Sequence, residues 1–196
     1  MSTLRQSQAM ATRQKLIEVA RDLFARDGFD SVTTTALCEA AGVTRGALYH
    51  HFTNLTEVME AVFTTVEQEL LTEVERTLAG VGDSRARLVA ATGEVLRVVA
   101  RDRVTLQIVF VEAPAALRWS RWRALDGGRS LALITQLLTE AAAGGHLVAG
   151  ADPRLAAQLV LGAVNEAGMY LARVGTAEAA DRLRAQVELL VRGLLA

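Results

Sequence analysis

Arg45, Tyr49 and His50 crowd a short predicted helix in which a glycine and two histidines add nothing to helix stability. The guanidinium of Arg45 is a fork of donors that can pair with two acceptors, O6 and N7, on the edge of a guanine base. Gly46 and Ala47 are small enough to let a partner approach closely, and Tyr49 and His50 can reach phosphates. The alternative is a solvated helix face that binds nothing.

A pair of short helices joined by a glycine-containing turn must position these side chains. Thr33 can cap a helix that runs to about Ala41, Gly42 ends it, and Thr44 can cap the helix that carries Arg45. This is the helix-turn-helix arrangement, in which the second helix lies in the DNA major groove. The end amides and the Thr33 and Thr44 hydroxyls can then hold phosphates, so we expect double-stranded DNA as a partner.

The remaining sequence predicts an all-α fold, because it has two prolines, little strand-like alternation and apolar residues spaced by three and four. Proline disfavours helix in the residue before it, which predicts a helix end before Ala113-Pro114. Gly127-Gly128 leaves open whether one helix is interrupted. Together with three helices up to residue 52, about nine helices are expected, the later ones over residues 54–78, 84–101, 103–113, 117–143, 153–174 and 176–195.

Residues 12–63 resemble the DNA-binding region of the tetracycline-repressor (TetR/AcrR) family of bacterial transcriptional regulators. The matching string is GFDSVTTTALCEAAGVTRGALYHHFTNLTEVMEAVF. The resemblance implies a three-helix DNA-binding domain with an N-terminal arm over residues 1–55, and a helical regulatory, ligand-binding and dimerisation domain over residues 56–196. It also implies roles for single residues: phosphate contacts for Thr33, Thr44, Tyr49 and His50, and base contacts for Arg45, Gly46 and Ala47.

Leu55 departs from the family pattern, which commonly has a lysine near the start of the fourth helix. A phosphate anchor is therefore missing at this position. Arg5 and Arg13, from the N-terminal arm, are the candidates to replace it.

The last two predicted helices carry small-residue and apolar stripes that suit either the internal core or a four-helix dimer interface. Periodicity alone leaves these two open, and the family resemblance favours a homodimer. Two copies would read two half-sites about one helical turn, ~34 Å, apart, so we expect a palindromic operator. The resemblance further implies a repressor that a small-molecule effector releases from DNA.

Polar and aromatic residues placed among apolar ones suggest the lining of an effector site. The candidates are Gln107, Phe110, Glu112, Trp119, Trp122, Asn165, Met169 and Tyr170. For the two tryptophans ordinary packing or interface roles are favoured over a ligand contact. Glu112 and Glu166 would recognise a cation only if buried, and a helical glutamate usually lies on a solvated face. A rival interpretation gives this domain dimerisation alone; a ligand-sized cavity would argue against it, and a filled core would support it.

Other classes of function find little support in the sequence. It has no HExxH, GxSxG, CxxC or glycine-rich phosphate loop, so we expect no catalysis, no metal and no cofactor. The single Cys38 is expected in the core. No apolar run approaches the ~20 residues of a membrane span and no signal peptide is evident, so a cytoplasmic protein without membrane contact is expected. Net charge is +1 over residues 1–55 and −2 over the rest, too even to identify a DNA-binding protein by charge alone.

Overall fold

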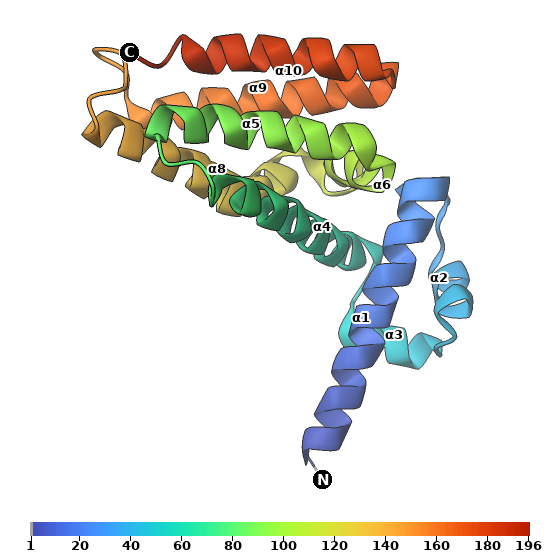
Figure 1. The fold of residues 1–196 in the computed structure, drawn as a ribbon. Coiled ribbons are helices and arrows are strands. Elements are labelled where there is room, and N and C mark those ends of the chain that lie inside the picture. The colour runs from blue at the N-terminus through green and yellow to red at the C-terminus, as the bar shows by residue number, and fades with distance from the viewer. Residues whose placement is uncertain (1) are drawn as a thin grey trace.

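The computed structural model describes residues 2–196, with side chains from residue 6 onward, and these residues form an all-α fold. A small head is joined to a larger helical body by one long helix (Figure 1). The head contains α1 (Ser2–Asp27), η1 (Phe29–Ser31), α2 (Thr34–Ala41) and α3 (Arg45–His51). The long helix is α4 (Leu55–Leu78), and the body adds α5 (Ser84–Arg101), α6 (Arg103–Gln107), η2 (Ile108–Glu112), α7 (Ala113–Ala116), α8 (Arg118–Ala143), α9 (Pro153–Val174) and α10 (Ala177–Arg192).

The predicted helix-turn-helix is confirmed, and its caps are the expected ones. The Thr33 hydroxyl accepts a hydrogen bond from the Ala36 amide at 3.1 Å, and the Thr44 hydroxyl accepts one from the Ala47 amide at 3.2 Å. Between the two helices Gly42 has a left-handed backbone, with φ of 62°, which favours glycine. Helix α1 already starts at Ser2, so the segment that was expected to be an N-terminal arm is helical.

Helix α4 starts in the head and runs into the body (Figure 1). The Asn54 side chain caps it by accepting from the Glu57 amide at 2.9 Å, and the Glu57 carboxylate accepts in return from the Thr53 amide at 2.6 Å. Its apolar face is fully buried at Val58, Met59 and Phe63. The helix therefore joins head and body through continuous packing.

Two expectations about the body needed the structure to decide them. Helix α8 runs unbroken through Gly127-Gly128. The predicted helix end before Pro114 is wrong: the chain passes through the π-helix η2 directly into α7, and Ala113 keeps helical angles of −65° and −45°. Pro114 lies in the first turn of α7; because proline has no N–H, it leaves one carbonyl of the preceding helical turn without its usual donor.

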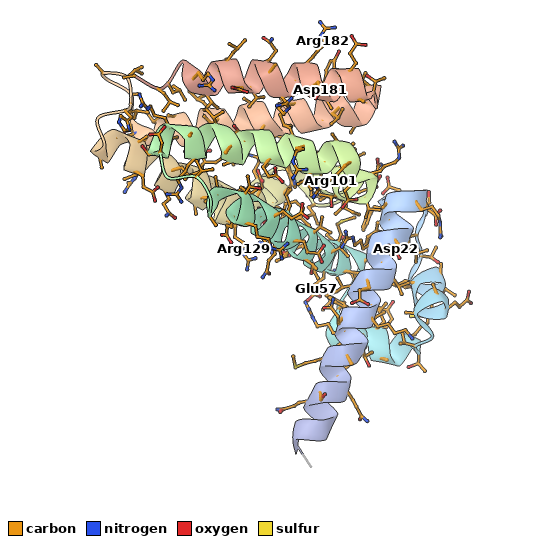
Figure 2. All side chains as sticks on the ribbon, in the orientation of Figure 1. Asp22, Glu57, Arg101, Arg129, Asp181 and Arg182 are labelled. Atoms are coloured by element: carbon orange, nitrogen blue, oxygen red, sulfur yellow. The ribbon has the colours of Figure 1, made fainter. Side chains whose placement is uncertain are left out.

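Helices α9 and α10 lie on the side of the body remote from α2 and α3 (Figure 1). The last helix ends at Arg192, three residues earlier than expected, and Leu195 pairs with Leu147 in an isolated bridge. Asp181 and Arg182 are exposed on α10 (Figure 2). Among the described helices, α9 alone is apolar and long enough to cross a membrane by composition, which the sequence argument had not anticipated, and half of that window is buried in the fold.

Candidate nucleic-acid interface and effector cavity

The predicted reading face of α3 is open to solvent. Arg45, Gly46 and His50 are exposed, Tyr49 is 52% exposed and Ala47 is half-buried. On the opposite side of the same helix Leu48 is fully buried and anchors α3 to the head. The two capping threonines are exposed beside this face. All seven residues expected to contact DNA therefore lie on or beside the two short helices, and their roles stay predictions.

The Arg45 side chain is tethered to the start of α2. Its guanidinium donates to the Thr35 hydroxyl at 3.0 Å and lies 3.5 Å from the Thr34 hydroxyl. These two threonines hold the fork in front of the helix pair before any partner arrives. Sequence reasoning named neither one, although the run Thr33-Thr34-Thr35 at a helix start was a visible signal.

The junction between α1 and the end of α3 brings a second cation to this side. The Arg13 guanidinium lies 5.1 Å from the centre of the Phe52 ring, a cation–π contact. Nearby, burial lowers the pKa of His51, and the charges of His50 and Arg13 lower it further. Leu55, at the position where the family has a lysine, is half-buried and packs on the core. Arg13 is exposed beside the end of α3, and its phosphate contact stays a prediction; the Arg5 side chain lies outside the described residues.

A partly enclosed cavity of about 40 Å³ lies in the body between α4, α5, α8 and α9, with η2 at one side. Its size is enough for a few water molecules and far below the roughly 300–1,000 Å³ of pockets that hold drug-sized ligands. Its wall is mostly apolar. The lining residues are Glu67, Leu70, Leu71, Val74, Ala91, Thr92, Val95, Val109, Phe110, Asp126, Ser130, Leu133, Ile134, Leu161, Val164 and Asn165.

Two of the eight residues expected to line an effector site, Phe110 and Asn165, are on this wall. The Phe110 ring packs against Gly168 so closely that a Cβ there would lie 2.6 Å from it, which explains the glycine in α9. Asn165 donates to the Asp126 carboxylate at 2.7 Å. Both therefore shape the cavity from two different elements.

The other six expected residues lie away from the cavity. Glu112 accepts from the Phe29 backbone amide at 2.7 Å and from the Gln107 amide group at 2.9 Å, so this carboxylate ties the head to the body. Trp119 is 61% exposed and Trp122 is fully buried, with their ring centres 5.0 Å apart. Met169 packs at the edge of the core and Tyr170 is exposed.

Sequence reasoning missed the two buried carboxylates of the cavity, Glu67 and Asp126, which are 4% and 3% exposed. Burial raises the pKa of Glu67 to about 7, with Asp126 adding to the effect. Burial likewise raises the pKa of Asp126. For Glu67 the sequence held a signal of burial: this residue lies four positions after Phe63 and three before Leu70, within the apolar stripe of α4.

Comparison with known proteins adds matches along both parts of the chain. The family model described as bacterial regulatory proteins, tetR family, matches residues 16–62. The model described as tetracyclin repressor-like, C-terminal domain, matches residues 85–194, more than half of the chain.

Individual relatives agree with these matches. The HTH-type transcriptional regulator UidR of Escherichia coli (strain K12) is 28% identical over 76 residues, 39% of this chain and 39% of UidR, so the match spans about two fifths of that relative. A crystallised TetR-family transcriptional regulator from Pectobacterium atrosepticum is 26% identical, with a TM-score of 0.76 over 97% of each chain. FadR from Bacillus subtilis, solved in complex with stearoyl-CoA, is 20% identical, with a TM-score of 0.77 over 91% of this chain and 96% of FadR. At that identity the likeness to FadR shows the fold alone.

Fold and surface together define an all-α protein with an exposed helix-turn-helix on a separate head. The family matches carry the assignment one step further. The chain belongs to the tetracycline-repressor (TetR) family of bacterial regulatory proteins.

Proposed function

We propose that this chain is a ligand-responsive transcriptional repressor that binds a palindromic operator as a homodimer and is released from it by a small molecule. The observation that carries the proposal is the exposed face of α3, where the Arg45 fork is held by Thr35 beside the small residue Gly46. A helix with this face enters the major groove, Arg45 reads a guanine, and the threonine caps and Tyr49 contact phosphates. A cytoplasmic location is part of the proposal, because the operator is there.

Dimerisation is supported by apolar side chains left exposed on the last two helices. Leu155 and Leu159 are 66% and 73% exposed on α9, and Leu189 and Leu190 are each 63% exposed on α10. Large apolar side chains grouped on neighbouring helices are typical of a protein–protein interface. A two-fold pairing through α9 and α10 leaves both heads free to reach successive major grooves.

Release requires that an effector bind differently to two arrangements of head and body. Helix α4 both lines the cavity and starts in the head, and the Glu112–Phe29 hydrogen bond is a second joint between the two parts. Phe110 on the cavity wall and Glu112 at the joint belong to the same π-helix. Enlargement of the cavity therefore bears on both connections to the head.

The chemistry of the bound ligand in FadR does not carry over to this cavity. Stearoyl-CoA is a drug-sized or larger molecule, and a cavity of about 40 Å³ is too small to hold it. The small volume favours one alternative function, a DNA-binding dimer without an effector. A ligand-responsive repressor and a DNA-binding dimer without an effector differ in one observable. Only for the repressor does a small molecule that binds the body release the protein from DNA.

The test of DNA reading is selection of bound sequences from a random duplex pool with the purified protein. Enrichment of a two-fold symmetric site with a guanine in each half is the expected result. Arg45→Ala should lose the preference at that guanine, while Arg26→Ala, a control on the exposed end of α1 whose guanidinium pairs with Asp27 at 2.7 Å, should keep it. A pool without any enriched sequence would overturn the proposal.

A further inference from the structure

The charge balance of the cavity is incomplete. Glu67 and Asp126 are the only charged residues on its wall among those described. Asp126 has a counter-ion, because the Arg123 guanidinium lies 3.1 Å from its Oδ2. Glu67 has no ion-pair partner among the described residues, and its Oε1 accepts from the Ser130 hydroxyl at 2.8 Å.

Burying a carboxylate without a counter-ion is unfavourable, and the usual response is retention of the proton. This is the physical reason for the raised pKa of Glu67, to about 7. The groups that face it from α8 are Asp126, which opposes ionisation, and Arg129, which favours it weakly from the surface. Helices α5 and α9 contribute Thr92 and Asn165 to the wall, and η2 contributes only apolar side chains.

We propose that the effector is an organic monocation, a protonated amine or amidine on an apolar body, whose charged group pairs with Glu67 inside this cavity. The inference rests on the proposed function, because it gives that function's effector a chemical class. A cationic N–H group supplies the missing counter-charge and donates a hydrogen bond to the carboxylate. The surrounding leucine, valine and isoleucine side chains take the apolar body.

An access route lies between α4 and α8. Leu71 and Leu133 line the cavity and also line an open groove on the surface, whose other walls include Gln68, Glu75 and Arg129. The groove and the cavity therefore meet at these two side chains. Because the cavity holds only about 40 Å³, a ligand must part them and move α4 relative to α8.

The test uses matched ligands that differ only in charge. Octylamine and 1-adamantylamine, each protonated at neutral pH, are titrated calorimetrically into the DNA-free protein beside the corresponding alcohols and carboxylates. The amines should bind at least tenfold more tightly than their alcohols, and the carboxylates should bind most weakly. Equal binding of amine and alcohol, or no binding of either amine, would overturn the inference.

Two variants locate the charge that the amine recognises. Glu67→Gln keeps the side-chain shape and an acceptor for Ser130, and it should abolish the preference for amine over alcohol. Glu94→Gln is the matched control, since Glu94 is 6% exposed but pairs with Arg97 and is absent from the cavity wall. An amine preference that survives Glu67→Gln would contradict the assignment.

The pH dependence gives an independent readout. Because a bound cation displaces the proton of Glu67, amine affinity should rise about tenfold between pH 6 and pH 8, as a pKa of about 7 requires. A flat profile, or one that falls with pH, would indicate recognition of a neutral group and overturn the inference.

Failure of this inference and failure of the proposed function are distinguishable. Calorimetry without DNA tests only the cavity, whereas selection of duplexes tests only operator reading. Amines that bind through Glu67 but do not release a selected site would leave the cavity assignment intact and contradict effector-controlled release.

Discussion

The reading face of α3 and the wall of the cavity use polar side chains in opposite ways. On α3 the polar groups are exposed, and Arg45 is steadied only by the threonines of α2. In the cavity Glu67 is 4% exposed and lacks a counter-ion. In the function proposed above, groups on the first surface would bind DNA with little prior desolvation, whereas a cationic ligand would relieve the unfavourable burial of the second. The two regions would then contribute binding energy by different routes: direct contacts on DNA and charge compensation in the body.

Arg45→Ala should produce the largest effect on the DNA side of this comparison. Loss of a bidentate contact to guanine weakens discrimination by about 1–3 kcal/mol at each half-site, so the dimer loses roughly twice that. Competition binding between the selected site and a variant with both guanines replaced measures it. An unchanged preference would contradict the assignment of Arg45 as the base reader.

Glu67→Gln should show the stored cost of burial in the absence of any ligand. The folded protein holds the Glu67 proton up to a pKa of about 7, against an ordinary value of 4.5. Between these values the folded state binds more protons than the unfolded state, so the wild-type free energy of unfolding falls as pH rises. The Gln variant lacks this loss, and its advantage over wild type should grow from pH 4.5 to pH 7 by on the order of 3 kcal/mol. Urea denaturation at several pH values measures the difference; a constant difference would show that Glu67 is not held in its protonated form.

Glu112→Ala probes the joint between the two regions. The change leaves the Phe29 amide without its acceptor, which costs about 1–3 kcal/mol in stability when the amide is shielded from water. It should also weaken effector-induced release more than it weakens operator binding. Glu166→Ala, an exposed position on α9, serves as the control. Equal effects of Glu112→Ala and Glu166→Ala on release would show that Glu112 does not couple the cavity to the head.

Gly168→Ala tests the packing behind the cavity wall. An added Cβ would lie 2.6 Å from the Phe110 ring, so the ring or α9 must shift, at about 1–3 kcal/mol. Gly162→Ala on the same helix has open space around the added Cβ and should be neutral or stabilise the fold by up to about 1 kcal/mol. Thermal denaturation of the two variants measures the difference in stability. Equal stability of Gly168→Ala and Gly162→Ala would contradict this account.

Tyr49→Phe should give the smallest effect. Loss of one hydroxyl contact to a phosphate weakens binding by about 0.5–1.5 kcal/mol for every sequence alike. The same titration on selected and unrelated duplexes would detect it. Weakening confined to the selected site would instead make Tyr49 a base-reading residue.

The head was predictable from sequence because its geometry follows local rules. Thr33, Gly42 and Thr44 are capping and turn residues whose partners lie within a few positions along the chain. The Asn54–Glu57 capping pair is equally local. The Arg45–Thr35 contact was not anticipated, because it joins two helices across the turn.

The cavity was mostly beyond sequence reasoning because four helices distant in the chain build it. The sequence makes Glu112 and Glu166 cation-binding candidates only if they are buried, yet the buried pair on the cavity wall comes from α4 and α8, and Glu112 bonds to the head instead. Of the aromatic candidates, only Phe110 lies on the wall, whereas Trp122 is buried elsewhere and Trp119 and Tyr170 are exposed. The sequence signal for a buried carboxylate was its position on an apolar stripe, as at Glu67. An apolar stripe alone does not say which helix will pack on it, so the rest of the cavity wall could not be predicted.

The most direct measurement of the central claim is the binding stoichiometry on the selected duplex. The purified chain is titrated onto the full site and onto a duplex in which one half is scrambled, with mass measured by light scattering. A two-fold reader should bind the full site as two chains per duplex and bind the half-site at least a hundredfold more weakly. Binding of one chain per duplex, with equal affinity for both duplexes, would contradict the account of a dimer that reads DNA through two copies of α3.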